Sequence, residues 1–278
     1  MIDELVQRAL AEDLGRGDLT TTAVVPAGAT ARATVEQRGP GVIFGLEAAA
    51  EVFRQSGNGE LRFRATAEEG SWRLSGEVAA IEGPAAGLLA GERVALNLLG
   101  RLSGVATITA RFVTAVEGTG TRILDTRKTT PGLRALEKAA VVAGGGVSHR
   151  AGLYDAILVK ENHALLAGGV GEAARLALAN RGDAAFVEVE VESLAELDEV
   201  LAAGVDRVLL DDMSLRDMRE GVRRAHAAGA IAEASGSVSL DWAQAVAETG
   251  VDFISVGALT HSAPALDLSL LLAAYSGR

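Results

Sequence analysis

The chain has 278 residues, is 49% hydrophobic, carries a formal net charge of −11 and contains no cysteine. It can therefore bury one large core, or one core with a smaller companion domain, but it can form neither disulfides nor a thiolate metal site. Its acidic balance argues against a nucleic-acid surface and no apolar run approaches the roughly 18 residues of a membrane span, so we expect a soluble, cytoplasmic protein.

Residues 1–105 mix helix-like and strand-like segments without a regular order. The chain begins with an amphipathic pattern, MIDELVQRALAEDLG, which lacks the basic start and continuous apolar run of a signal peptide. Strand-like segments lie at 33–37, 41–45, 61–66 and 77–83, and helices are expected near 1–14, 46–55 and 88–102. The mixture predicts an α+β sandwich domain over 1–105, which the C-terminal residues 263–278 are candidates to join.

From residue 106 onward, short β-branched runs alternate with helical segments. The runs lie at 122–125, 156–160, 186–191, 205–212, 230–235 and 253–257, and the helices at 132–142, 171–180, 193–203, 215–228 and 239–249. Helix starts are marked by Thr130 before Pro131 and by Ser193 followed by Glu196. The alternation implies βαβ units, and hence a (β/α) barrel-like catalytic domain over 106–262 with fewer than eight strands. A doubly wound open sheet is the alternative fold.

Charged residues or glycine turns follow nearly every predicted strand, where barrels carry their catalytic groups. In the run 186–191, FVEVEV, the valines share one face, and Glu188 and Glu190 share the other. Outer helices require the valine face, so both glutamates point into the barrel, where buried carboxylates need cationic partners. All three lysines of the chain lie within residues 125–163. We interpret this stretch as a site for a small, highly anionic ligand.

Three groups of residues divide the expected site into subsites. Arg127 and Arg150 suit a carboxylate or phosphate, because a guanidinium group can bind two of its oxygens at once. Glu190 and Asp211, on neighbouring strands, are hard oxygen ligands that can hold Mg²⁺ beside a phosphate. The turns after the last two strands suit a phosphate held by backbone amides. The residues expected to line that phosphate site are Ser235, Gly236, Gly257 and His261.

Eight motifs, spread over essentially the whole chain, occur in a specific order. They are EDLGRGDLTT at 12–21, GERVALNLLGRLSGVAT at 91–107, DTRKTTPGLR at 125–134, GGGVSHRAGLYDAILVKENH at 144–163, EVEVESL at 188–194, LLDDM at 209–213, EASG at 233–236 and VGALTHS at 256–262. In these motifs the chain resembles the quinolinate phosphoribosyltransferase family. The resemblance implies transfer of the phosphoribosyl group of phosphoribosyl pyrophosphate (PRPP) to quinolinate, with Mg²⁺, to give nicotinate mononucleotide, pyrophosphate and CO₂.

The resemblance also implies roles for individual residues. Arg127, His149 and Arg150 would hold the quinolinate carboxylates, with Lys128 and Lys160 near the reacting centre and the phosphates. Glu190 and Asp211 would hold the ribose hydroxyls and the metal. The residues on the 5′-phosphate side would be Ser235, Gly236, Gly257 and His261. Members of the family are dimers, and Arg93 matches the arginine that one subunit supplies to its partner's active site.

A few residues are expected to be structural, and others depart from the family's pattern. Lys138 lies in the middle of a predicted helix and is expected on the surface, although its position in the family's motif also allows a peripheral role at the site. His163 is expected either in the site or as an anchor of its own loop. Val142 stands where an arginine is common. The other departures replace asparagine, or in one case glycine or asparagine, at Ser148, Asp212 and Ser237. None of them removes a matched catalytic group.

Two alternative functions remain. Lys160, at a barrel strand end, is placed to form a Schiff base as in aldolases, although the arginine-rich pocket argues against this chemistry. A repurposed paralogue, like the molybdenum-transport-associated relatives of the family, would bind a phosphorylated ligand without catalysing the transfer. The complete set of matched ionisable residues favours an active enzyme.

Overall fold

The computed structural model describes residues 2–273, in which the chain forms two compact units. One unit comprises the described residues up to Ile108, Val142–Gly145 and the described residues from Ala263 onward, and the other comprises Thr109–Val141 and Gly146–Ser262. Residue 105 lies inside the long helix α4 (Ala85–Ala115), and the division into domains at that residue stays a prediction. Residues 274–278 of the predicted C-terminal segment lie outside the described residues.

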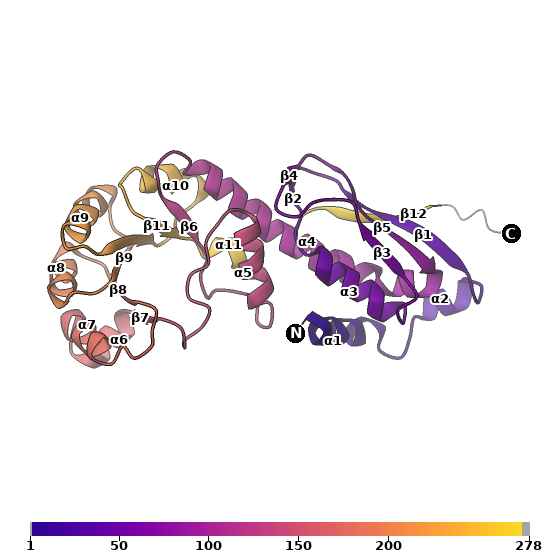
Figure 1. The fold of residues 1–278 in the computed structure, drawn as a ribbon, viewed down its shortest axis with the longest axis horizontal. Helices are drawn as coiled ribbons and strands as arrows, with labels where there is room; N and C mark the ends of the chain where they lie inside the picture. Colours follow the sequence, from indigo (N-terminus) through magenta and orange to yellow (C-terminus); the bar gives the residue numbers. More distant parts are fainter. Residues whose placement is uncertain (1, 274–278) are drawn as a thin grey trace. The chain divides into compact units, whose positions relative to one another are not determined.

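The N-terminal unit is built on a four-stranded antiparallel sheet in the order β12-β1-β5-β3 (Figure 1). Its strands are β1 (Thr30–Gln37), β3 (Arg62–Ala65), β5 (Gly76–Pro84) and β12 (Leu268–Ala273). Two helices, α1 (Ile2–Leu14) and α3 (Leu46–Ser56), share one buried core with this sheet and the start of α4, through side chains such as Val6, Phe53 and Leu88. The unit also contains α2 (Leu19–Val24), β2 (Gly41–Val42) and β4 (Trp72–Arg73).

The second unit is a six-stranded parallel sheet in the order β6-β11-β10-β9-β8-β7. Its strands are β6 (Arg122–Leu124), β7 (Ile157–Val159), β8 (Val187–Val191), β9 (Arg207–Asp211), β10 (Ile231–Ser235) and β11 (Phe253–Ser255). From β7 to β11 each strand pairs with the next in sequence, and β6 follows β11. A doubly wound sheet would instead reverse its strand order near the middle. The predicted barrel-like domain of fewer than eight strands is therefore confirmed, and the barrel is open between β6 and β7.

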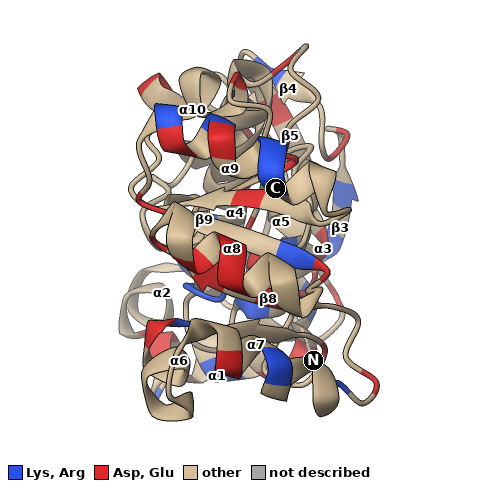
Figure 2. Ribbon diagram, turned by 90° about the vertical axis from the view of Figure 1, so that its left-hand side faces the viewer, with Lys and Arg blue, Asp and Glu red and all other residues tan. Residues whose placement is uncertain are grey.

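Helices cover the outside of this sheet, as Figure 1 shows for α7 to α10. The helices of this unit are α5 (Arg134–Ala143), α6 (Glu161–Ala167), α7 (Val170–Ala179), α8 (Leu194–Ala203), α9 (Leu215–Ala227), α10 (Leu240–Ala247) and α11 (Ala258–His261). The exposed faces of α8 and α9 carry charged residues (Figure 2), and Arg224 of α9 forms an ion pair with Asp198 of α8 at 2.8 Å. Within residues 2–273, every helix is too short or too polar to cross a membrane.

The strand β8 shows why its glutamates face inward. Val187, Val189 and Val191 are all buried, and their spacing places them on the face that packs against the outer helices. Glu188 and Glu190 are 0% and 8% exposed, and their carboxylates contact His149 and Lys160 respectively. The prediction that both glutamates point into the barrel is confirmed.

The helix α5 begins two residues later than predicted. The sequence Thr130–Pro131 predicted a capped start at 132, but residues 131–133 form a turn and the helix starts at Arg134. The backbone N–H and the hydroxyl of Thr130 donate instead to the buried Glu137 carboxylate, at 2.9 and 2.8 Å. This interaction fixes the segment between β6 and α5.

Candidate active site

The predicted site residues of the barrel unit gather around two cavities at the C-terminal ends of its strands. The larger cavity, of about 680 Å³, is lined by eight of them: Lys128, Lys160, Glu190, Asp211, Ser235, Gly236, Gly257 and His261. The smaller cavity, of about 290 Å³, is lined by Arg127, His149 and Arg150, again with Lys128 and Lys160. Both lysines thus belong to both cavities. Arg93 is exposed on α4 and lines neither.

A lysine–carboxylate pair lies where the two cavities adjoin. Lys160 directly follows β7, and its Nζ forms an ion pair with the Glu190 carboxylate at the end of β8. Burial raises the pKa of Glu190, and the hydrogen bond from Lys160 acts in the opposite direction. His163, one turn along α6, accepts the backbone N–H of Lys160 on Nδ1 at 3.0 Å. His163 therefore anchors its loop, which was one of its two expected roles.

The turns after β9 and β10 interlock at the far side of the larger cavity. Asp212 has a left-handed backbone with φ 47°, and its Oδ1 accepts the backbone N–H of Ser237 at 3.3 Å. Gly236 has φ 112°, and a Cβ atom there would lie 2.2 Å from the same Oδ1. Only glycine therefore fits at position 236 without moving Asp212. Asparagine, the residue common at position 212, carries an equivalent acceptor oxygen, so the departure to aspartate preserves this contact.

The smaller cavity combines two guanidinium groups with apolar walls. Arg127 Nε is buried and has no hydrogen-bond partner among the described residues, whereas Arg150 Nη1 donates to the Ala156 carbonyl at 3.3 Å. Burial and the nearby Arg127 charge lower the pKa of Arg150. The walls include Leu158 and Leu209. Such a cavity suits a flat apolar ring that carries carboxylate groups.

His149 has both ring nitrogens engaged by the protein. Its Nε2 lies 3.0 Å from a Glu188 oxygen and 3.3 Å from a Glu233 oxygen, and both glutamates are fully buried. Its Nδ1 accepts the backbone N–H of Arg150 at 2.7 Å. Burial lowers the pKa of His149, but the two carboxylates outweigh it and raise the pKa to about 9. The hydrogen bond from the Arg150 backbone N–H to Nδ1 opposes this rise in pKa, because a protonated nitrogen accepts no hydrogen bond.

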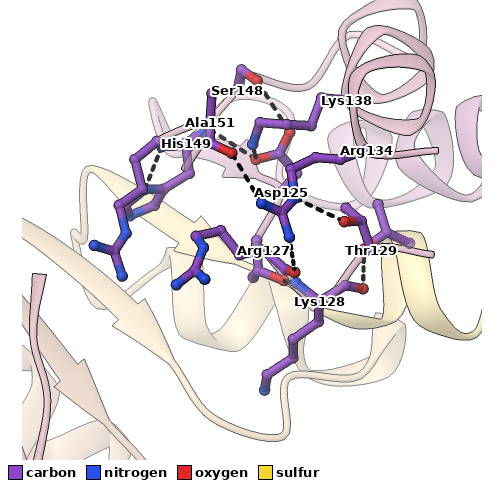
Figure 3. A network of polar contacts seen from close by, with 12 residues as sticks. Asp125, Arg127, Lys128, Thr129, Arg134, Lys138, Ser148, His149 and Ala151 are labelled. Atoms are coloured by element: carbon purple, nitrogen blue, oxygen red, sulfur yellow. Dashed lines mark hydrogen bonds and ion pairs between the residues drawn. The ribbon is translucent and has the colours of Figure 1, made fainter. Parts of the chain in front are cut away.

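A buried ion pair supports the backbone of His149 (Figure 3). Lys138 was expected on the surface, but this prediction is wrong: its side chain is 8% exposed and forms an ion pair with the fully buried Asp125. Asp125 also accepts the backbone N–H of His149 at 2.9 Å and the hydroxyl of Ser148 at 3.2 Å. Lys138 lies on the inner face of α5 and Asp125 directly follows β6, so the pair joins this helix to the strand end. Burial raises the pKa of Asp125.

Four charged residues next to the site had no assigned role in the sequence analysis: Asp125, Lys138, Glu188 and Glu233. The signal that could have found Glu188 and Glu233 is a charged residue at an inward position of an otherwise apolar strand. Glu188 was expected to face inward for that reason, but its partner was not identified. Val142, where an arginine is common in the family, is 53% exposed.

An open parallel barrel, with lysine and arginine side chains beside carboxylates in the cavities at its strand ends, is the architecture of a barrel enzyme that acts on small charged molecules. Residues 18–103 match the model of the N-terminal domain of quinolinate phosphoribosyl transferase, and residues 105–271 match that of its C-terminal domain. The chain therefore belongs to the quinolinate phosphoribosyltransferase family of pentosyltransferases, and the predicted family is confirmed.

Individual relatives agree with this assignment over almost their full length. The nicotinate-nucleotide pyrophosphorylase [carboxylating] of Mycobacterium leprae is 44% identical over 275 residues, covering 96% of this chain and 95% of that protein. A probable enzyme of the same name from Bacillus subtilis is 39% identical, with 97% and 92% covered. The solved structure of the Francisella tularensis nicotinate-nucleotide pyrophosphorylase superposes with a TM-score of 0.91 at 36% identity, covering 98% of this chain and 96% of that one.

Proposed function

We propose that the chain transfers the phosphoribosyl group of PRPP to quinolinate and releases pyrophosphate and CO₂, giving nicotinate mononucleotide for NAD biosynthesis. The observation that carries the proposal is the junction of two unlike cavities at Lys128 and Lys160. The smaller one fits a pyridine dicarboxylate, and the larger one, with its carboxylates and glycine turns, fits a phosphorylated ribose. The two substrates would then meet beside the two lysines.

In the smaller cavity, Arg127 and Arg150 bind the two quinolinate carboxylates. Arg127 Nε has no partner in the described protein, so an incoming carboxylate supplies the acceptor that this buried group needs. His149 makes no further hydrogen bond to the substrate, because both of its nitrogens already have partners. Leu158 and Leu209 contact the ring.

In the larger cavity, Glu190 and Asp211 bind the ribose hydroxyls and Mg²⁺. Their carboxylates line one cavity on neighbouring strands, and such hard oxygen donors fit this ion. When bound, Mg²⁺ supplies positive charge to the pyrophosphate leaving group. The 5′-phosphate side is formed by the turn residues Ser235, Gly236, Gly257 and His261.

The reaction needs position and electrostatics but no covalent nucleophile. The pyridine nitrogen attacks C1 of the ribose as pyrophosphate leaves, and Glu190 stabilises the positive charge that develops on the sugar. Lys128 and Lys160 stabilise the departing anion. The ring nitrogen is then positively charged and makes the ring an electron sink, which favours loss of CO₂ from the adjacent carbon. The electron pair of the broken C–C bond stays on that carbon, which then takes a proton from water.

The proposal extends to assembly and location. Two chains form a homodimer in which Arg93 of each subunit enters the neighbouring active site, consistent with its exposed position on α4. The enzyme works in the cytoplasm on its two small-molecule substrates and uses no nucleic-acid or membrane partner.

The test is an assay of the purified protein with quinolinate, PRPP and Mg²⁺, following nicotinate mononucleotide and CO₂ together. Product formation should stop with EDTA. Arg127→Ala should lower kcat/KM by about 100-fold, as expected for loss of a bidentate hydrogen bond between a guanidinium group and a carboxylate. Arg219→Ala, an exposed arginine of α9, is the matched control. Absence of product from folded protein would contradict the proposal and favour the repurposed paralogue. Borohydride trapping of a carbonyl substrate on Lys160 would favour the aldolase alternative.

A further inference from the structure

Two buried carboxylates at the smaller cavity converge on one atom. Glu188 on β8 and Glu233 on β10 are 0% exposed, and their nearest oxygens lie 3.0 and 3.3 Å from His149 Nε2. None of their four carboxylate oxygens has a hydrogen-bond partner among the described residues, so the contact with His149 is an ion-pair contact. Buried carboxylates without other partners are costly to the fold, so this convergence on His149 calls for a functional reason.

The rest of His149 is held just as closely. Its Nδ1 accepts the Arg150 N–H at 2.7 Å, and its own N–H donates to Asp125 at 2.9 Å. The edge of its ring meets Phe186, with the ring centroids 5.7 Å apart. The ring therefore links the buried carboxylates to the backbone of Arg150. A ring released at Nε2 could rotate and would then lose the contact at Nδ1.

We propose that Glu188 and Glu233 are positioning residues, which hold His149 by Nε2 and thereby fix Arg150 at the wall of the quinolinate cavity. The inference rests on the proposed function for its kinetic consequence. Glu188 lines neither cavity and acts on the substrate only through the histidine, whereas Glu233 also lines the smaller cavity beside His149. Their removal should weaken quinolinate binding and spare the PRPP side of the site.

The kinetic test uses Glu188→Gln and Glu233→Gln, which keep the side-chain shape and remove the charge. Each should raise KM for quinolinate by about tenfold, the size expected when a partner that orients an active-site histidine is lost, and leave KM for PRPP within about twofold. Glu199→Gln, an exposed glutamate of α8, is the matched control and should leave both constants unchanged. A general loss of structure would instead shift both KM values and kcat together and lower Tm, which would overturn the proposal.

A second measurement does not depend on activity. In ¹⁵N-histidine-labelled protein, assigned with a His149→Asn variant, the Nε2 proton of His149 should exchange slowly enough to be observed in the wild type. It should disappear in either glutamine variant. An unchanged Nε2 proton with unchanged KM for quinolinate would overturn the proposal. If the wild type does not turn over quinolinate at all, the proposed function fails, and the proton signal still decides how His149 is held.

His149, Glu188 and Glu233 also have the composition of a metal site, and a metal site must be distinguished from the positioning role. Their ligand atoms lie within 4.8 Å of one another, close enough to surround a metal ion. Equilibrium dialysis of the wild type and Glu233→Gln against Zn²⁺ and Mn²⁺ distinguishes the two arrangements. Loss of one bound ion per chain in the variant would overturn the positioning account, and equal binding by the wild type and the variant would support it.

Discussion

Lys138 and Asp125 form a buried ion pair, and neither charge can be removed alone without leaving the other unpaired. Lys138→Met should lower the free energy of unfolding by about 3–5 kcal/mol, because the Asp125 carboxylate then lies uncompensated in the interior. The double variant Asp125→Asn/Lys138→Met should be less destabilised than the single one. Urea denaturation measures both, with Arg219→Met on the surface of α9 as control. A loss below about 1 kcal/mol for Lys138→Met would show that the pair is solvated.

His149 predicts a pH dependence of stability. Its buried carboxylate neighbours raise its pKa from 6.5 to about 9, against the effect of burial. The folded protein therefore binds a proton that the unfolded chain releases near pH 6.5, so the stabilisation is complete below that pH and is lost as pH rises through about 9. It amounts to at most about 3 kcal/mol.

The comparison of wild type with His149→Gln isolates this contribution. The difference in their free energies of unfolding, measured by urea denaturation, should shrink between about pH 6 and pH 9.5. His226→Gln replaces an exposed histidine of α9 and controls for general effects of histidine removal. A difference that stays constant over this range would mean that His149 does not gain a proton on folding.

Two helices of the barrel begin at serines that differ in their contacts. Ser193 at the start of α8 accepts the Glu196 N–H on Oγ at 3.2 Å, whereas Ser239 at the start of α10 makes no side-chain capping bond. Ser193→Ala should therefore lower the free energy of unfolding by about 1 kcal/mol, and Ser239→Ala by less than about 0.5 kcal/mol. Chemical denaturation of both variants tests this, and equal losses would contradict the assignment of the cap.

The elements that the sequence predicts best are those with a strong period. All six barrel strands were expected, because apolar β-branched runs with charged ends stand out between helical segments. The helices α6 and α11, of seven and four residues, were missed because they are too short to show a helical period. The helix α4 runs from 85 to 115 rather than 88–102. Its continuation carries the buried polar residues Ser103 and Thr109, which obscure the apolar face.

The residues of the site, like the elements of the fold, could be predicted from the sequence only in part. Residues at strand ends could be grouped from the sequence, because parallel strands bring their C-terminal ends to one edge. The burial of Lys138 could not be predicted, since it depends on which face of α5 meets the barrel. The meeting of Glu188 and Glu233 at His149 depends on the strand order β8-β9-β10, which the sequence left open between two folds.

At the scale of the assembly, the proposed homodimer makes each active site depend on two chains. Arg93 belongs to the N-terminal unit rather than to the barrel unit that carries both cavities, and the resemblance to the family implies that it contributes to the partner's site. Arg93→Ala and Arg127→Ala should each abolish most activity when assayed alone. The two variants carry their defects in different parts of the site, and this separation allows a test by complementation.

Co-expression of Arg93→Ala and Arg127→Ala with two different affinity tags, followed by purification on both, yields hybrid dimers. In a hybrid, the subunit with intact Arg127 receives an intact Arg93 from its partner, whereas the other site lacks both arginines. About half of the wild-type kcat per dimer should therefore return, as a two-fold symmetric pair of shared sites requires. If Arg93 served its own chain, each hybrid site would lack one arginine, and the hybrid would remain as inactive as the single variants. The recovery thus tests at once that the chain dimerises and that Arg93 crosses to the neighbouring site.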